Sequence, residues 1–167
     1  SDGKTMVRVP GLANASPVVV GSNAYYVGLQ SAAYRLPKQS MDKVEPRTLW
    51  EAKPRGGTFY ASAIVHGGLV YAVSTNHILT VMDAKSGKRV YVRRLNLGRQ
   101  PVWASLCLAG DQVYISSRDG TTAVIKAGRK FTLLARNELE FFIASPVFAG
   151  KRMYVRTSGH LYCVGKS

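Results

Sequence analysis

The stretch Ala61-Ser62-Ala63-Ile64-Val65-His66-Gly67-Gly68-Leu69-Val70-Tyr71 decides the fold, because its pattern recurs along the chain. Ala-Ser begins the pattern, a glycine follows six residues after the alanine, and a tyrosine follows ten residues after it. The alanine, glycine and tyrosine recur in four segments: Ala15/Gly21/Tyr25, Ala61/Gly67/Tyr71, Ala104/Gly110/Tyr114 and Ala144/Gly150/Tyr154. Their offsets of 46, 43 and 40 residues indicate a repeat architecture in which each unit packs on its neighbours.

Each repeat has room for four short strands. An apolar, β-branched run such as Val18–Val20 follows Ala-Ser, and the glycine then marks a tight turn. A second strand surrounds the tyrosine, as in Leu69–Val73, and a third follows a polar turn, as in Ile78–Met82. After one more turn comes a fourth strand, as in Arg89–Val92 or Phe131–Leu134. The sequence therefore predicts an all-β fold, a β-propeller of about four four-stranded blades.

We expect a single propeller region over residues 1–167, with repeats at approximately 13–57, 58–100, 101–141 and 142–167. The first repeat is long because residues 37–47, with prolines near both ends, form a loop insertion. The last repeat stops after its third strand, whereas residues 5–9 supply a spare strand that completes a blade.

Three ways of closing the ring follow from these ends. The spare strand closes a small four-bladed ring within one chain, or the chain is the C-terminal half of a larger propeller. In the third, two copies combine into a two-fold, eight-bladed ring. We favour a missing N-terminal half as the partner, followed by the self-paired homodimer.

The charge is strongly positive, with 23 Lys+Arg against 9 Asp+Glu and a formal net charge of +14. A field of this size attracts an anionic surface or polymer, or an acidic protein face. Nucleic acid is disfavoured because aromatic and basic residues do not interleave. A solvated edge that deters strand addition is the alternative interpretation. The candidate anionic-partner surface is a basic outer rim made of Arg89, Arg93, Arg94, Arg99, Lys126, Arg129, Lys130, Arg136, Lys151 and Arg152.

The sequence predicts no catalytic, cofactor-binding or metal-binding residue, and no transmembrane segment because no apolar run approaches ~20 residues. His66, His77 and His160 lie in three different blades without metal-ligand spacing, and we expect surface histidines. Cys107 and Cys163 stand in apolar strands without a CxxC partner, so we expect two buried free thiols.

One turn carries a family resemblance. The segment Val81-Met82-Asp83-Ala84-Lys85-Ser86-Gly87-Lys88-Arg89-Val90-Tyr91 resembles the docking motif of quinoprotein (PQQ-like) propellers, A-x-D-x-x-x-G-K-x-x-W, with Val for the first Ala and Tyr for Trp. The resemblance implies that Asp83 and Gly87 organise the turn before Lys88, while the ring of Tyr91 wedges between blades. Trp50 and Phe131 look like the same wedge in the first and third repeats. Residues 144–156 and 160–166 are similar to the C-terminal blades of planctomycete-type PQQ-like repeat proteins.

The resemblance implies a periplasmic or secreted location and two functions. The first is a non-catalytic, protein-interacting or scaffolding propeller, which we prefer. The alternative is a fragment of a quinone-dependent alcohol or sugar dehydrogenase. That enzyme needs carboxylates around Ca²⁺ and commonly a vicinal cysteine pair, whereas this chain has no adjacent cysteines and its acidic residues fall mostly at turns.

Overall fold

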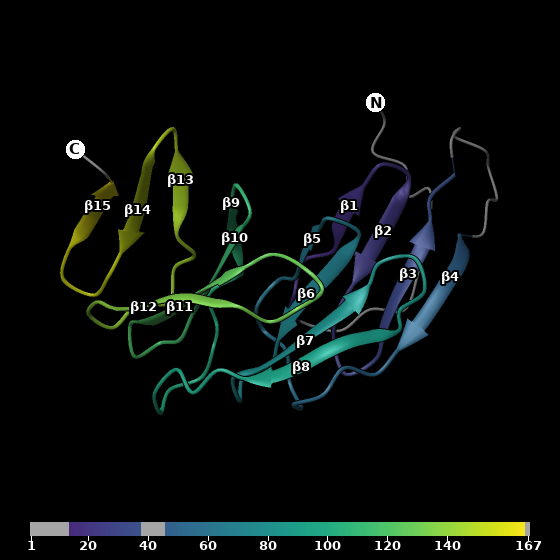
Figure 1. Ribbon diagram of the computed structural model, residues 1–167, viewed down its shortest axis with the longest axis horizontal. Helices are drawn as coiled ribbons and strands as arrows, with labels where there is room; N and C mark the ends of the chain where they lie inside the picture. Colours follow the sequence, from purple (N-terminus) through teal and green to yellow (C-terminus); the bar gives the residue numbers. More distant parts are fainter. Residues whose placement is uncertain (1–13, 38–45, 166–167) are drawn as a thin grey trace.

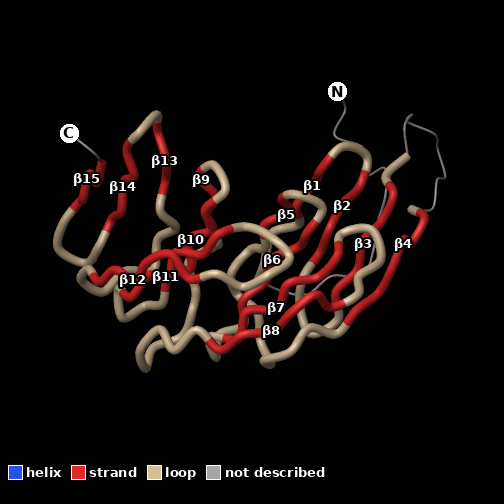
Figure 2. Tube along the Cα trace, in the orientation of Figure 1, coloured by secondary structure: helices blue, strands red, loops and turns tan. Residues whose placement is uncertain are grey.

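The computed structural model describes residues 14–37 and 46–165, and every regular element in these ranges is a β-strand (Figures 1 and 2). Fifteen strands form four antiparallel sheets, and neighbouring strands in each sheet are consecutive in the chain. The predicted all-β fold of about four blades is therefore confirmed. Within these ranges there is no helix with the length and apolarity needed to cross a bilayer.

We number the blades in chain order. Blade 1 contains β1 (Val18–Val20), β2 (Asn23–Tyr26), β3 (Ser31–Arg35) and β4 (Arg47–Ala52). Blade 2 contains β5 (Ile64–His66), β6 (Leu69–Val73), β7 (Ile78–Asp83) and β8 (Arg89–Arg94). Blade 3 contains β9 (Cys107–Ala109), β10 (Gln112–Ser116), β11 (Thr121–Lys126) and β12 (Leu133–Glu138). Blade 4 contains β13 (Val147–Ala149), β14 (Arg152–Arg156) and β15 (Leu161–Gly165).

One expected strand begins later than predicted, and another lies outside the described residues. The fourth strand of blade 3 begins at Leu133 rather than at Phe131, because the turn extends to Thr132, whose carbonyl accepts the Lys126 N–H at 2.9 Å. The spare strand expected at residues 5–9 lies outside the described residues, as does most of the insertion at 37–47.

The repeated glycine makes the turn between the first two strands of every blade. Its φ is +58° at Gly21, +56° at Gly67, +59° at Gly110 and +58° at Gly150. This left-handed conformation is strained for residues with a Cβ, so the spacing that defines the repeat follows from the turn.

Each blade is apolar on two faces, which we call forward (toward the next blade) and backward (toward the preceding blade). In blade 2, Tyr71 and Val81 on the forward face pack in one cluster with Val113 and Ile125 of blade 3. On the backward face, Val70, Ala72 and Met82 pack with Tyr25, Ala33 and Trp50 of blade 1. Alternation along each strand sends side chains to the two faces in turn, so the core consists of layers between the blades.

Blade 1 and blade 4 lie at opposite ends of the row of sheets (Figure 1). The four-bladed ring closed within one chain is therefore not the arrangement that the described residues adopt. One backward face and one forward face consequently remain at the two ends of the row.

Candidate functional site

The turn between β7 and β8 is held by the side chain of Asp83. Its Oδ1 accepts the N–H groups of Lys85 at 3.2 Å and Ser86 at 3.1 Å, and Gly87 follows with a φ of +69°. Arg129 of blade 3 donates to the other carboxylate oxygen at 3.0 Å. These hydrogen bonds, that of Arg129 above all and then those of Ser86, hold the pKa of Asp83 below its usual range.

Trp50 docks blade 1 on this turn. Its indole N–H donates to the carbonyl of Ala84 at 2.8 Å, and the ring is almost fully buried. A Cβ placed on Gly87 would lie 2.7 Å from Cδ2 of Trp50, so the ring sits directly against the backbone of the turn. The turn of one blade thus receives the aromatic ring of the preceding blade.

Tyr91 and Phe131 meet between blades 2 and 3. Their ring centroids are 6.2 Å apart, and burial raises the pKa of Tyr91 to about 12. Strand pairing places Trp50 opposite Ala33 and Tyr91 opposite Val81. The corresponding position in blade 3, opposite Val124, is Ala135 rather than Phe131.

Phe131 therefore does not provide a wedge between blades 3 and 4. A groove of about 630 Å³ lies there instead, and Ala135, Phe148, Met153 and Val164 are among the residues that line it.

The Ala-Ser steps form a ladder of hydrogen bonds that runs from blade to blade. The N–H of Ser16 donates to Oγ of Ser62 at 2.9 Å, and the N–H of Ser62 donates to Oγ of Ser105 at 3.1 Å. The N–H of Ser105 donates in turn to Oγ of Ser145 at 2.9 Å. The two inner serines, Ser62 and Ser105, thus accept from the preceding blade and donate to the following one. Sequence reasoning recognised the serine as a repeat position but assigned it no role.

The ten residues of the basic rim are all exposed. Arg89, Arg93 and Arg94 lie on β8, whereas Arg99 lies in the loop after it. Lys126, Arg129, Lys130 and Arg136 lie at the end of β11, in the following turn and on β12, and Lys151 and Arg152 lie at the β13–β14 turn.

Three of these arginines also brace the fold. Arg129 pairs with Asp83, and Arg136 donates to the carbonyls of Leu95 and Asn96 at 2.8 Å each. Arg94 donates to the carbonyl of Asn76 at 3.4 Å. By contrast, Arg93, Lys126 and Lys130, which we call the corner patch, have no ion pair among the described residues, and the guanidinium carbon of Arg93 lies 5.9 Å from the ring centroid of Phe131.

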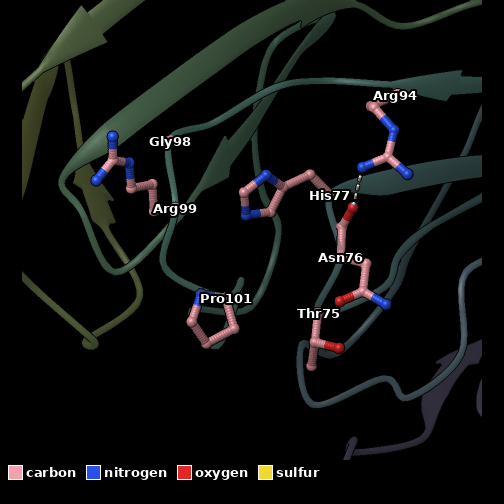
Figure 3. A pocket seen from close by; sticks show the side chains of 7 residues that line it. All are labelled: Thr75, Asn76, His77, Arg94, Gly98, Arg99 and Pro101. Atoms are coloured by element: carbon pink, nitrogen blue, oxygen red, sulfur yellow. Dashed lines mark hydrogen bonds between the residues drawn. The ribbon is translucent and has the colours of Figure 1, made fainter.

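Two rim residues, Arg94 and Arg99, line a pocket of about 340 Å³. His77 stands between their side chains in Figure 3. The N–H of Leu97 donates to Nδ1 of His77 at 3.2 Å, and Nε2 lies 2.8 Å from the carbonyl oxygen of Gln100. Because a carbonyl can only accept, Nε2 carries the proton and the imidazole is neutral. His77 is thus buried and clamps the 95–100 loop, which corrects the expectation of a surface histidine.

Other expectations about single residues are corrected as well. Cys163 is exposed rather than buried, and Cys107 is half-buried. Both are free thiols, as expected. His160 is exposed, and its Nδ1 lies 2.7 Å from Oε1 of Glu140, which also accepts from the hydroxyl of Tyr162 at 3.0 Å. In the described ranges, no group of three or more His, Cys, Asp or Glu side chains is arranged to hold a metal ion.

An exposed aromatic cluster was missed by the sequence reasoning. Tyr60 and Trp103 each stand directly before an Ala-Ser step, and their ring centroids are 6.0 Å apart. The guanidinium of Arg118 lies over Trp103 at 4.0 Å and over Phe141 at 5.0 Å. The signal was partial, because the residue before Ala-Ser is aromatic in two of the four repeats but is Asn14 and Ile143 in the others.

No protein-family model and no curated protein matches the chain. Solved structures do share its fold, among them BamB from Moraxella catarrhalis, with a TM-score of 0.68 over 89% of this chain at 12% identity. A europium-containing methanol dehydrogenase gives a TM-score of 0.57 over 73% of the chain at 12% identity. The fold is that of a β-propeller. The chain spans 41% of the BamB chain and 24% of the dehydrogenase chain, so it corresponds to part of each propeller.

Two computationally designed proteins are also similar. The alignment with Ika8 covers 96% of this chain and 49% of the Ika8 chain, with a TM-score of 0.73 at 12% identity. With Ika4, the two chains cover 99% of each other with a TM-score of 0.71 at 11% identity. At such low identities the likeness concerns the fold alone.

Proposed function

We propose that the chain is a non-catalytic interaction module that docks an anionic partner, a protein face or a polymer, on its basic rim. The observation that carries the proposal is the exposure of all ten rim residues, of which Arg129 alone has an acidic partner in the described part of the chain. Unpaired guanidinium and ammonium groups on one part of a surface attract anions and steer their approach.

Two acidic side chains close to the rim, Asp83 and Asp119, are bound to backbone N–H groups. Asp83 binds the backbone of its own turn, and Oδ2 of Asp119 accepts the N–H groups of Arg99 and Gln100 at 2.5 and 2.6 Å. The corner patch is one part of the rim that has no ion pair among the described residues, so its charges are open to a partner.

Heparin-agarose tests the proposal with a defined polyanion. We expect the triple variant Arg93→Gln/Lys126→Gln/Lys130→Gln to elute at clearly lower salt than the parent, because fewer anionic groups are then neutralised on binding. The matched control removes three exposed charges of blade 1, as Arg47→Gln/Lys53→Gln/Arg55→Gln, and should elute close to the parent. Equal losses in the two variants would show that net charge, not the corner patch, drives binding.

We further propose that the protein is periplasmic or secreted and of the planctomycete-type PQQ-like kind. The support is the docking motif around Asp83 and Gly87 together with the similarity of the last repeat. Fractionation of producing cells tests the location, and recovery of the protein in the cytosolic fraction alone would contradict it.

A further inference from the structure

In the part of the chain that the structure describes, no further blade packs on the forward face of blade 4. Leu161 occupies the same position in blade 4 as Leu79 in blade 2 and Thr122 in blade 3. In each blade, this residue pairs with the residue that follows the alanine of the repeat by twelve positions. Leu79 is 0% and Thr122 7% exposed, whereas Leu161 is 71% exposed. Val147, opposite Tyr154 on the same face, is 62% exposed. Large apolar side chains of this kind are covered wherever a following blade is present.

The backward face of blade 1 likewise has no covering blade among residues 14–37 and 46–165. Val19 lies opposite Ala24 and is 57% exposed. Its counterparts Val65 and Leu108 are partly buried and pack in the layers between blades. The two open faces are thus of opposite kind, one built to receive a following blade and the other to receive a preceding blade.

The serine ladder is open at the same two places. Ser145, the last serine, presents its N–H to a following blade, and Ser16, the first, presents its Oγ to a preceding blade, by analogy with the three internal rungs. Both residues are exposed, and neither of these groups takes part in a rung with another described residue. A donor at one end and an acceptor at the other are what a further rung requires.

The charges at the open faces are also complementary. Arg156 lies opposite Leu161, so it stands on the forward face of blade 4. Glu51 pairs with Ala32, and Ala32 pairs with Tyr26. Their neighbours Trp50, Ala33 and Tyr25 face blade 2, so Glu51 lies on the opposite, backward face of blade 1. Both side chains are exposed. Opposite charges favour this pairing over contacts between two forward faces, which would bring arginines together.

We propose that the forward face of blade 4 docks on the backward face of blade 1 of a second copy, so that two copies close one ring head to tail. Such a contact is heterologous, because it joins two different faces. The assembly closes with two copies when the blades of each copy span half of the ring. The four blades superpose on 49% of the Ika8 chain, so they follow half of a chain about twice as long.

Native mass measured on the purified chain at micromolar concentration tests the proposal. We expect about 36 kDa, twice the 18.2 kDa of one chain. Leu161→Asp and Val19→Asp should each shift the mass to that of one chain, because each breaks both contacts of the ring. An equimolar mixture of the two variants should regain a two-chain species, since Leu161→Asp retains an intact blade 1 face and Val19→Asp an intact blade 4 face.

Leu29→Asp is the matched control, because Leu29 is 54% exposed but lies in the β2–β3 turn. It should keep the two-chain mass, and circular dichroism should show the same strand signal for all variants. A parent of one-chain mass would overturn the proposal, as would masses that keep rising beyond two chains with concentration. A Val19→Asp variant that stays a dimer would replace it with pairing of forward faces.

Discussion

Gly87 is the residue at which turn geometry and blade packing meet. Its φ of +69° disfavours any Cβ, and a Cβ there would also lie 2.7 Å from the ring of Trp50. We expect Gly87→Ala to lower the free energy of unfolding by about 2–4 kcal/mol, from backbone strain and overpacking together. Urea denaturation followed by tryptophan fluorescence measures this loss.

Gly67→Ala separates the two causes. Gly67 has a φ of +56°, but nothing lies within 4 Å of an added Cβ. The control should therefore cost only the strain, about 1 kcal/mol. Equal losses in both variants would show that contact of the turn with Trp50 contributes nothing.

At the residue scale, the sequence predicted what is decided within one turn. Glycine at a tight turn and Asp83 at the start of the docking turn are local requirements, and their spacing repeats or matches a motif. His77 and Cys163 were misjudged because their burial depends on segments far along the chain. The backbone of residues 97–100 covers His77, whereas Cys163 stays exposed because no following blade covers it among the described residues.

At the scale of elements, the junction between blades 3 and 4 is the loosest of the three. Ala135 stands where blades 1 and 2 have Trp50 and Tyr91, and β12 is exposed along its whole length. We expect Ala135→Tyr to fill the groove against Phe148 and Met153 and to stabilise the protein by about 0.5–2 kcal/mol. An increase in the thermal unfolding midpoint measures the effect.

Glu138→Tyr provides the control on the same strand. Glu138 lies opposite Thr121, on the face of blade 3 that is turned toward blade 2. A tyrosine there places the same ring on β12 without reaching the groove, so the midpoint should not rise. If Ala135→Tyr leaves the midpoint unchanged, the groove is not a packing defect.

The same junction shows what element-scale sequence reasoning misses. The strands and their order were predicted because four apolar segments recur per repeat. Phe131 is the wedge that the resemblance to the docking motif predicts. However, each of the three third–fourth strand pairs contains a register shift, which in blade 3 lies between Val124 and Ile125. With that shift and a longer turn, the wedge position falls on an alanine, and only the pairing of the strands reveals it.

At the scale of the whole molecule, the repeat predicts the propeller but not what covers its ends. Each of the two internal blades has both faces covered by neighbouring blades. The repeat pattern does not say what covers the outer faces of blades 1 and 4. The three closures left open by the sequence differ only in this respect. The exposed faces exclude closure within the described residues and make the contact between ends the decisive measurement.

The reactivity of the Cys163 thiol tests whether the two ends of the row are in contact. Cys163 lies opposite Tyr154, on the forward face of blade 4, and is exposed in one copy. Cys107 provides an internal reference, because burial raises the pKa of its thiol to about 11 and only about a thousandth is thiolate at pH 8. Alkylation at pH 8 should therefore distinguish a paired chain from a single one.

In the parent, both cysteines should react slowly with iodoacetamide, because a second copy covers Cys163. In Val19→Asp, Cys163 should react at least tenfold faster while Cys107 stays slow, as peptide mass spectrometry of the two sites would show. The substitution lies in blade 1, at the other end of the row, so a faster reaction at Cys163 has to come from loss of a second copy (Figure 1). Equal rates at Cys163 in the parent and in Val19→Asp would mean that the forward face of blade 4 is open in solution and that head-to-tail pairing does not occur.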